Sequence, residues 1–338
     1  MPPAPVPPVP PPPVPGDPVP GDPVPDDRPE IAVILILRDP ADSPDAVLAA
    51  LADQPEAAGF EVILADGRPD GPPDGPPDRP GDGARQVPRS AAPAGVTWIR
   101  APGLNMPMLK ACGIAASRAA TLAFLEPKAV PQPGWAAALR QARAAAPQAA
   151  IGGAVRFGGC DTAADQAAFI FEYADFSARH LHAGRTRDLP GNNMALPRAA
   201  LLAQCGDILA REGLNKPFCQ ARLLAAGVAL HLAPGMAVSM TTTHRLPGLL
   251  LSRMRYARCF GGTRIALAGP GRRWRYRLGA PLVPLLVLAR RMAGLRRAET
   301  GARRVGTLPA LALLCLAWAG GEIAGYWGGA GTACEKLY

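Results

Sequence analysis

The sequence predicts an α/β fold, with a mostly parallel sheet that carries helices on both faces and a helical, membrane-associated C-terminal region. Residues 31–37 (IAVILIL) form a continuous apolar run rich in branched residues, which is typical of a strand buried on both faces. A helix-like segment and a second apolar run, residues 60–65 (FEVILA), follow in the order that a right-handed βαβ unit requires. From residue 245 onward the chain becomes basic and apolar, which marks a separate region.

The chain of 338 residues can hold one large domain with accessory segments. Residues 1–30 repeat proline, valine, glycine and aspartate, so we expect an extended, disordered tail; a solvated tail is favoured over a proline-rich ligand for a partner domain. A second low-complexity stretch, residues 68–95, predicts a disordered insert. The folded domain is therefore expected to span residues 31–244, and the helical region residues 245–338.

The first half of the domain predicts alternating helices and strands. Ser43 to Leu51 predicts a helix with Ser43 as its N-cap. Val96 to Ile99 predicts a third strand, and Met108 to Ala119 predicts a second helix. This alternation is what a parallel sheet requires.

The stretch LAFLEPKAVPQPGW, residues 122–135, carries the main functional prediction. Leu122 to Leu125 predicts a buried strand, and Glu126 and Lys128 follow directly after it. Prolines and a glycine then break the backbone before the helix predicted for Trp135 to Ala146. Ligands of α/β sheets bind beyond the carboxyl ends of the strands, so Glu126 and Lys128 are expected to meet one.

The rest of the domain predicts a strand over Ile151 to Phe157, a helix over Phe218 to Leu224 and a strand over Val228 to Pro234. Between them lies the segment DLPGNNMAL, which contains Asn192 and Asn193. Paired amides beside a glycine suit hydrogen bonds to sugar hydroxyls, and they also suit a turn or a helix cap.

These segments together resemble family 2 glycosyltransferases. The strand-end motif of that family is apolar-Asp-x-Asp followed by a Pro-x-x-Gly-Trp turn, and residues 122–135 match its layout. Asp66-Gly67 resembles the family's Asp-Asp-Gly-Ser, Lys110 and Gly113 its Ala-Arg-Asn-x-Gly helix, and IGGAVRF and DLPGNNMAL two further segments. The resemblance covers residues 31–260 and implies a GT-A fold and inverting transfer from a nucleotide-diphosphate sugar.

The resemblance also implies which residues form the site. It places Asp39, Asp66, Lys110, Glu126, Lys128 and Lys216 on the nucleotide side, and Asn192 and Asn193 on the acceptor side. Glu126 and Lys128 stand where the family has two aspartates, and Asn215 and Lys216 stand where it has a Glu-Asp pair with the catalytic base.

Three readings of these departures stay open. Three of the four lysines fall at motif positions, so ammonium groups could replace the metal ion, with Glu212 as the nearest candidate base. A conventional enzyme would hold Mg²⁺ or Mn²⁺ through Glu126 and a differently aligned motif. Alternatively, catalysis is lost.

The C-terminal third predicts a membrane partner. Residues 245–304 contain fifteen arginines and one acid, a net charge of +14, which favours an anionic membrane surface over nucleic acid. Arg253, Arg255 and Arg258 recur on one helical face and could meet either a lipid-linked phosphate or the membrane surface, of which the surface is favoured. Residues 278–289 are too short to span a bilayer and are expected in its interface, whereas residues 308–330 are long enough either to span it or to insert in its plane, and spanning is favoured. Arg303 and Arg304 should then face the cytoplasm.

The seven cysteines are scattered without a C-x-x-C pair, which predicts reduced thiols in a cytosolic compartment, with neither a disulfide framework nor a zinc site. Taken together, the sequence predicts a membrane-associated glycosyltransferase of hexosyltransferase type at the cell membrane, with its catalytic domain on the cytoplasmic side. It would move a sugar to a lipid-linked or envelope saccharide. The alternative is an inactive relative that serves as a binding or scaffolding module in glycan assembly.

Overall fold

The computed structural model describes residues 29–68, 96–158, 162–298 and 306–335. Most of the predicted N-terminal tail, nearly all of the 68–95 insert, and the Arg303–Arg304 pair lie outside the described residues. The strands are β1 (Ile31–Leu37), β2 (Glu61–Asp66), β3 (Val96–Arg100), β4 (Thr121–Leu125), β5 (Ala129–Pro131), β6 (Ala150–Phe157), β7 (Gly184–Thr186), β8 (Asn193–Pro197) and β9 (Leu230–Met240).

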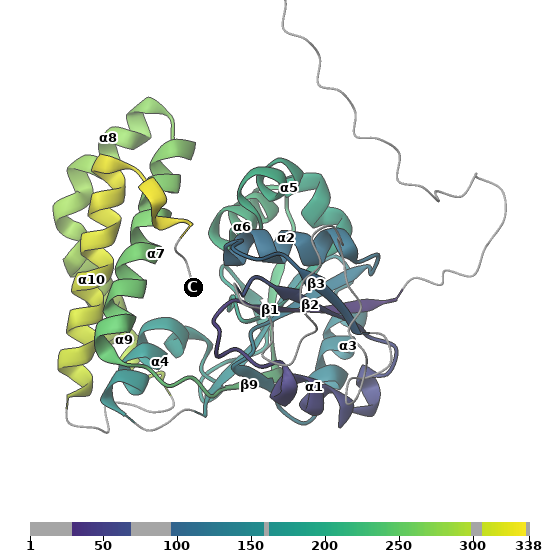
Figure 1. Ribbon diagram of the computed structural model, residues 1–338. Coiled ribbons are helices and arrows are strands. Elements are labelled where there is room, and N and C mark those ends of the chain that lie inside the picture. Colours follow the sequence, from purple (N-terminus) through teal and green to yellow (C-terminus); the bar gives the residue numbers. More distant parts are fainter. Residues whose placement is uncertain (1–28, 69–95, 159–161, 299–305, 336–338) are drawn as a thin grey trace, which may run out of the picture.

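The helices that flank these strands are α1 (Asp45–Ala52), α2 (Met106–Ala116), α3 (Trp135–Ala145), α4 (Ala163–Tyr173), α5 (Arg198–Glu212) and α6 (Lys216–Ala225). They are followed by α7 (Leu246–Leu267), α8 (Pro270–Gly279), α9 (Val283–Leu295) and α10 (Thr307–Gly328). Figure 1 shows the helical region, α7 to α10, beside the sheet region, which consists of β1 to β9 and α1 to α6.

Within the described residues, one sheet has the order β3-β2-β1-β4-β8-β6-β9-β5, with β7 paired to β9. The pairs from β3 to β4 are parallel, whereas β8 and β5 join their neighbours antiparallel. The carboxyl ends of β1 and β4 therefore lie at the same edge, as the parallel prediction requires. The predicted α/β class, with helices on both faces and a helical C-terminal region, is confirmed; beyond β4 the sheet is mixed.

Strand β1 shows why the sheet is buried on both faces. Alternate residues enter one core with α1, α3 and α4, and the residues between them enter a second core with α2, α5 and α6. All seven side chains of β1 are buried, so a continuous apolar run is what this position demands.

Two helix starts differ from the sequence prediction. Ser43 does not cap α1: Pro44 occupies the N-cap position and makes no side-chain cap bond. Helix α2 begins two residues earlier than expected because Asn105 caps it, with its side-chain oxygen accepting a hydrogen bond from the Met108 N–H at 3.0 Å.

Glycines allow α7 and α10 to touch backbone to backbone. A Cβ atom on Gly321 would lie 2.1 Å from the Met254 carbonyl oxygen, and one on Gly325 would lie 2.5 Å from that of Arg258. Small residues at such contacts are typical of closely packed membrane helices, where packing replaces the hydrophobic driving force.

Two helical segments are long and apolar enough to cross a membrane, by length and composition alone. They are Thr307–Gly328 and the run Pro270–Leu295, which includes the short turn Ala280–Leu282 between α8 and α9. The second run is longer than the apolar stretch 278–289 that the sequence suggested, because the helix extends over arginine-rich residues at both ends. A bilayer span of about 20 residues therefore fits either segment.

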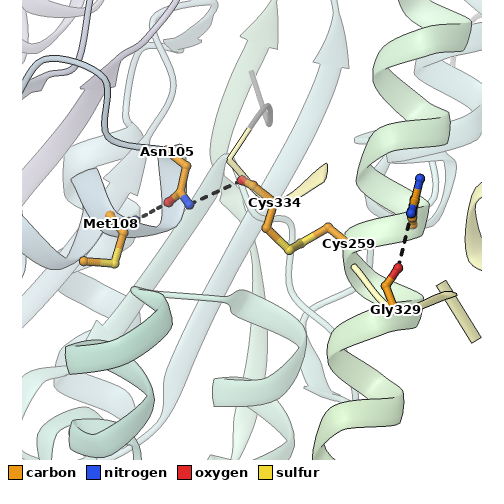
Figure 2. Close-up of a disulfide and its surroundings, with 6 residues drawn as sticks. Asn105, Met108, Cys259, Gly329 and Cys334 are labelled. Atoms are coloured by element: carbon orange, nitrogen blue, oxygen red, sulfur yellow. Dashed lines mark hydrogen bonds between the residues drawn. A yellow bond between two sulfur atoms is a disulfide. The ribbon is translucent and has the colours of Figure 1, made fainter. Parts of the chain in front are cut away.

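A disulfide joins α7 to the end of the described chain, as Figure 2 shows. Cys259 and Cys334 are bonded across 75 residues of sequence, so the prediction that all cysteines are reduced is wrong for this pair. The Cys334 carbonyl also accepts a hydrogen bond from the Asn105 side chain at 3.3 Å. The C-terminal segment is thereby tied both to α7 and to the first turn of α2.

Candidate functional site

Two cavities meet beyond the carboxyl end of β4. The first, of about 390 Å³, opens at the ends of β1 and β4 and is bordered by Asp39, Lys128 and His244. The second, of about 800 Å³, lies between the sheet region and helices α7 to α10. Five residues line both cavities and form their common wall: Met106, Glu126, Glu172, Tyr173 and Arg253. A ligand in one cavity would therefore touch the same side chains as a ligand in the other.

Glu126 is the central carboxylate of this wall. Burial raises its pKa, and the nearby Lys110 ammonium partly lowers it again. Lys110 is itself buried, which lowers its pKa, while Glu126 raises it, and its Nζ donates a hydrogen bond to the Gly191 carbonyl at 3.3 Å. Within the described residues no hydrogen bond or ion pair holds the Glu126 carboxylate, so it is available to a ligand.

Glu172 is a second carboxylate in the common wall, and sequence reasoning missed it. It lies near the end of α4 and forms an ion pair with Arg253 of α7, with Oε1 and Nη2 2.5 Å apart. Arg253 therefore faces the cleft, and the prediction that it lies at the membrane surface is wrong. A charged residue inside the otherwise apolar run FIFEY was the feature of the sequence that could have indicated this position.

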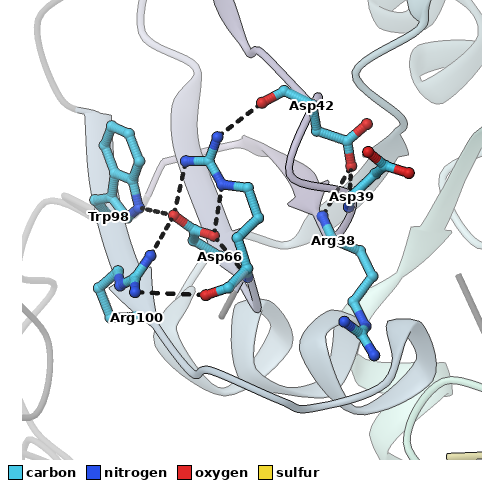
Figure 3. A network of polar contacts seen from close by, with 7 residues as sticks. Arg38, Asp39, Asp42, Asp66, Trp98 and Arg100 are labelled. Carbon is cyan, nitrogen blue, oxygen red and sulfur yellow. Dashed lines mark hydrogen bonds and ion pairs between the residues drawn. The ribbon is translucent and has the colours of Figure 1, made fainter. Parts of the chain in front are cut away.

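Lys128 and Asp39 border the first cavity on the loops that follow β4 and β1. The Lys128 Nζ lies 3.9 Å from Asp42 Oδ1. The other oxygen of Asp42 accepts hydrogen bonds from the backbone N–H groups of Arg38 and Asp39, each at 2.8 Å (Figure 3). Asp42 thus shapes the loop after β1 and contacts both Asp39 and Lys128, which line the same cavity.

Asp66 is held by protein donors (Figure 3). Its carboxylate accepts hydrogen bonds from the side chains of Arg68, Arg100 and Trp98 at 2.9–3.2 Å, and it also accepts one from the Arg68 backbone. Burial raises the pKa of Asp66, but the hydrogen bonds and charges of the two arginines outweigh burial and lower it. Asp66 is fully buried and lines neither cavity.

Asn192 and Asn193 have different surroundings. The Asn193 side chain accepts from the Trp135 indole at 2.9 Å and donates to the carbonyls of Ala154 and Met236. Gly153 makes this possible, because a Cβ there would lie 2.3 Å from Asn193 Nδ2. Asn192 lines the second cavity, and its buried Oδ1 has no hydrogen-bond donor.

The two remaining predicted residues lie toward the second cavity or outside both. Lys216 lines the second cavity and donates hydrogen bonds to Asp188 at 2.7 Å and to the Leu189 carbonyl at 2.5 Å. Glu212 is the last residue of α5 and lines neither cavity. The predicted lysines are therefore divided, with Lys128 in the first cavity and Lys110 and Lys216 in the second.

The described residues hold no cage of protein ligands for a divalent cation, because nowhere among them do three His, Cys, Asp or Glu side chains come together. Mg²⁺ is commonly held by one or two carboxylates together with substrate phosphates, and Glu126 is the carboxylate that could serve in this way. Glu126 has the Lys110 ammonium as its neighbour, which opposes a second cation.

No protein-family model matches the chain, and no curated protein matches it. Among solved structures, the chain is similar to the mannosyltransferase PcManGT from Pyrobaculum calidifontis in complex with GDP-Man and Mn²⁺, at 15% identity and a TM-score of 0.48, over 89% of this chain and 88% of that one.

Two further solved structures are similar at 10% identity and a TM-score of 0.43. They are GalNAc-T7 with UDP, GalNAc and Mn²⁺, and S. aureus TarS, and the matches cover 64% and 75% of this chain but only 44% and 43% of those proteins.

Proposed function

We propose that the protein is a membrane-associated glycosyltransferase of family 2, with a GT-A fold and an inverting mechanism. It moves a hexose from a nucleotide-diphosphate sugar to a lipid-linked or envelope saccharide acceptor. The observation that carries this proposal is the common wall of the two cavities at the carboxyl end of β4. A transferase for two substrates needs two sites that meet at the reacting atoms, with a carboxylate between them.

The first cavity is the proposed donor site. Ligands of α/β sheets bind at the carboxyl ends of the strands, and this cavity lies at the ends of β1 and β4. Lys128 supplies a positively charged ammonium group in this cavity. Lys110, which lines the second cavity near Glu126, supplies another. Fixed ammonium groups stabilise the negative charge that develops on a leaving diphosphate.

Glu126 is the proposed general base. It touches both cavities, whereas Glu172 is neutralised by Arg253 and Glu212 borders neither cavity. Glu126 would take the proton of the acceptor hydroxyl while the oxygen of that hydroxyl bonds to the anomeric carbon. The bond between that carbon and the diphosphate breaks, and its electron pair leaves with the diphosphate. A carboxylate whose pKa is raised is a better proton acceptor.

The helical region is the proposed membrane anchor, with the donor cavity on the cytoplasmic side. Its two long apolar segments and its net positive charge support an anionic membrane as partner. The Cys259–Cys334 disulfide argues against this cytoplasmic placement, because structural disulfides persist mainly in oxidising compartments. Labelling of Cys259 and Cys334 with a membrane-impermeant thiol reagent, before and after reduction in intact cells, would test this: labelling from outside contradicts the cytoplasmic placement.

A second candidate function is an inactive module that binds a nucleotide sugar or scaffolds glycan assembly. It is favoured by Asp66, whose carboxylate is saturated by protein donors at the position where the family resemblance expects a nucleobase contact. Donor binding without hydrolysis or transfer would distinguish this module from the enzyme.

The deciding experiment is calorimetric titration of the detergent-solubilised full chain with UDP and GDP, first with Mn²⁺ and then with EDTA. Binding that survives EDTA supports the lysine-based donor site. Binding only with Mn²⁺ supports a conventional metal enzyme. Absence of binding in both conditions contradicts the donor site and favours the scaffold.

A further inference from the structure

The second cavity has an apolar wall along α8 and α9. Gly279, Val283, Leu286 and Val287 line it at intervals of three and four residues, so they lie along one face of the helical run. Arg290 and Arg291 continue the same face at its far end. The wall therefore combines an apolar strip with a cationic end.

Two partly buried arginines that line this cavity each have a buried donor atom without an acceptor. The Nε atoms of Arg253 and Arg291 are buried and make no hydrogen bond. Both side chains are otherwise held in place: Arg253 by its ion pair with Glu172, and Arg291 by the Phe171 ring, whose centroid lies 4.4 Å from its guanidinium carbon. Buried polar donors in proteins are nearly always satisfied, so an acceptor is missing. Guanidinium groups bind phosphate oxygens strongly.

The cavity opens onto the apolar outer face of the helical region. Leu286 lines the cavity and is also 56% exposed. Next to it along the helix, Leu282 and Leu285 are 58% and 66% exposed. A ligand with a long apolar chain could therefore enter from a bilayer without crossing water, whereas a soluble phosphate would gain nothing from this wall.

We infer that the second cavity binds the phosphate and the first part of the apolar chain of a lipid-linked acceptor. The phosphate oxygens accept hydrogen bonds from Arg253 and Arg291, and the chain lies along Val283, Leu286 and Val287. This inference rests on the proposed function and names its acceptor class, a phosphate ester of a long apolar alcohol. The saccharide of such an acceptor would extend toward Glu126 and Asn192 in the same cavity.

The test is binding of farnesyl phosphate to the full chain in detergent micelles, measured by microscale thermophoresis without any donor. Farnesol, which lacks the charge, and inorganic phosphate, which lacks the chain, serve as the other two probes. We expect farnesyl phosphate to bind at least about tenfold more tightly than either, since both the charge-assisted hydrogen bonds and the apolar contacts contribute.

Variants locate the site. Arg291→Gln should weaken binding of farnesyl phosphate by about tenfold and leave farnesol unchanged. Arg296→Gln is the matched control, because Arg296 is exposed at the end of the same helix and lines neither cavity; it should have no effect. Leu286→Asp, at an exposed position that the fold tolerates, should weaken farnesyl phosphate even if Arg291→Gln misfolds, which circular dichroism would reveal.

Each contrary outcome has a definite meaning. Equal affinity for farnesyl phosphate and farnesol would overturn the phosphate site, and equal affinity for farnesyl phosphate and inorganic phosphate would show a soluble-anion site instead of a lipid site. Equal loss in Arg291→Gln and Arg296→Gln would place the ligand on the micelle surface. Titration of the same sample with UDP and GDP separates this inference from the proposed function, since donor binding without lipid binding overturns only the inference.

Discussion

The sheet region and the helical region differ in how far their large apolar side chains are buried. In the sheet region, strands such as β1 are fully buried between two helical layers. Among the described residues, all but two of the large exposed hydrophobic side chains lie on α7 to α10, and the two exceptions are Leu202 and Leu224. The sheet region thus buries nearly all of its large apolar side chains, partly against α7 and α10, whereas the helical region leaves an apolar face that a bilayer would cover.

Buried polar groups in the core of the sheet differ from those that line the second cavity. Asp66 and Asn193 of the sheet region have protein partners for their donors or acceptors and fix strands and loops. Arg253 and Arg291 of the helical region keep an unpaired Nε beside the second cavity. Asn192 of the sheet region also keeps an unpaired Oδ1 beside the second cavity, and buried Glu322 of α10 is fully paired, so the unpaired groups follow the cavity and not the region.

The largest expected effect is on catalysis at the junction of the regions. Glu126→Gln removes the proposed base and should lower the rate of transfer by about 1000-fold, with donor affinity nearly unchanged. Glu212→Gln is the matched control and should leave transfer intact. Initial rates with radiolabelled donor measure both variants. A large loss of rate in Glu212→Gln alone would show that Glu212, at the end of α5, is the general base.

The next effect tests the structural role of Asp66. Asp66→Asn leaves Arg68 and Arg100 without their buried carboxylate, and should lower the free energy of unfolding by about 3 kcal/mol. Urea unfolding followed by tryptophan fluorescence measures it, with the exposed Asp45→Asn as control. Unchanged stability with lost UDP binding would instead give Asp66 a role in the donor site.

Membrane association tests the apolar face directly. Replacing Leu282 and Leu285 by Asp should lower partition onto anionic vesicles by about 100-fold, since burial of each leucine contributes about 1.5 kcal/mol or more. The same two changes at Leu202 and Leu224, the exposed leucines of the sheet region, should have little effect. Vesicle co-sedimentation distinguishes the pairs, and equal loss in both would show that the helical region is no special anchor.

The lysines should contribute less. Lys128→Ala should weaken UDP and GDP by about fivefold and the nucleosides hardly at all, because Lys128 is partly exposed and its attraction to the diphosphate is screened. Lys216→Ala is measured in the same way, and a smaller loss is expected because Lys216 lines only the second cavity. Calorimetry with nucleotide and nucleoside measures the difference, with Arg185→Ala as a charge-matched control outside both cavities. Equal affinities throughout would dispose of the idea that ammonium groups replace a metal.

The smallest effect is a shift in pH dependence. Burial raises the pKa of Glu126, so the ionised base, and with it transfer, should be lost on acidification at a pH above the ordinary value of 4.5. Lys110 lowers that pKa, so Lys110→Met should move the acidic limb of the rate profile further upward. A limb that moves downward in Lys110→Met would show that another group controls it.

The sequence correctly predicted those elements that are specified by their own residues and not by distant contacts. The apolar run of β1 could be recognised because both of its faces are buried, and the turn before Trp135 because Gly134 takes a left-handed conformation, φ +83°, at the start of α3. The three-residue strands β5 and β7 were not predicted, because so short a strand has no periodicity and exists only through its pairing with β9.

Ion pairs, hydrogen bonds and disulfides between segments far apart in the sequence could not be predicted from local sequence patterns. The direction of Arg253 depends on Glu172, which lies on another helix, and the Cys259–Cys334 bond joins positions 75 residues apart. The saturation of Asp66 depends on Arg100 and Trp98 of β3, a strand that enters the sheet only after the 68–95 insert. Charge and cysteine patterns could not indicate these partners, because they arise from packing.

The common wall of the two cavities has a kinetic consequence. Because Glu126, Glu172 and Arg253 border both cavities, a ligand in either one changes the electrostatic surroundings of the other. In the proposed direct transfer, donor and acceptor must be present together, so double-reciprocal plots of rate against one substrate at several concentrations of the other should intersect. Any effect of bound donor on acceptor affinity must be matched by an equal effect of acceptor on donor affinity, since linkage between two binding sites is reciprocal.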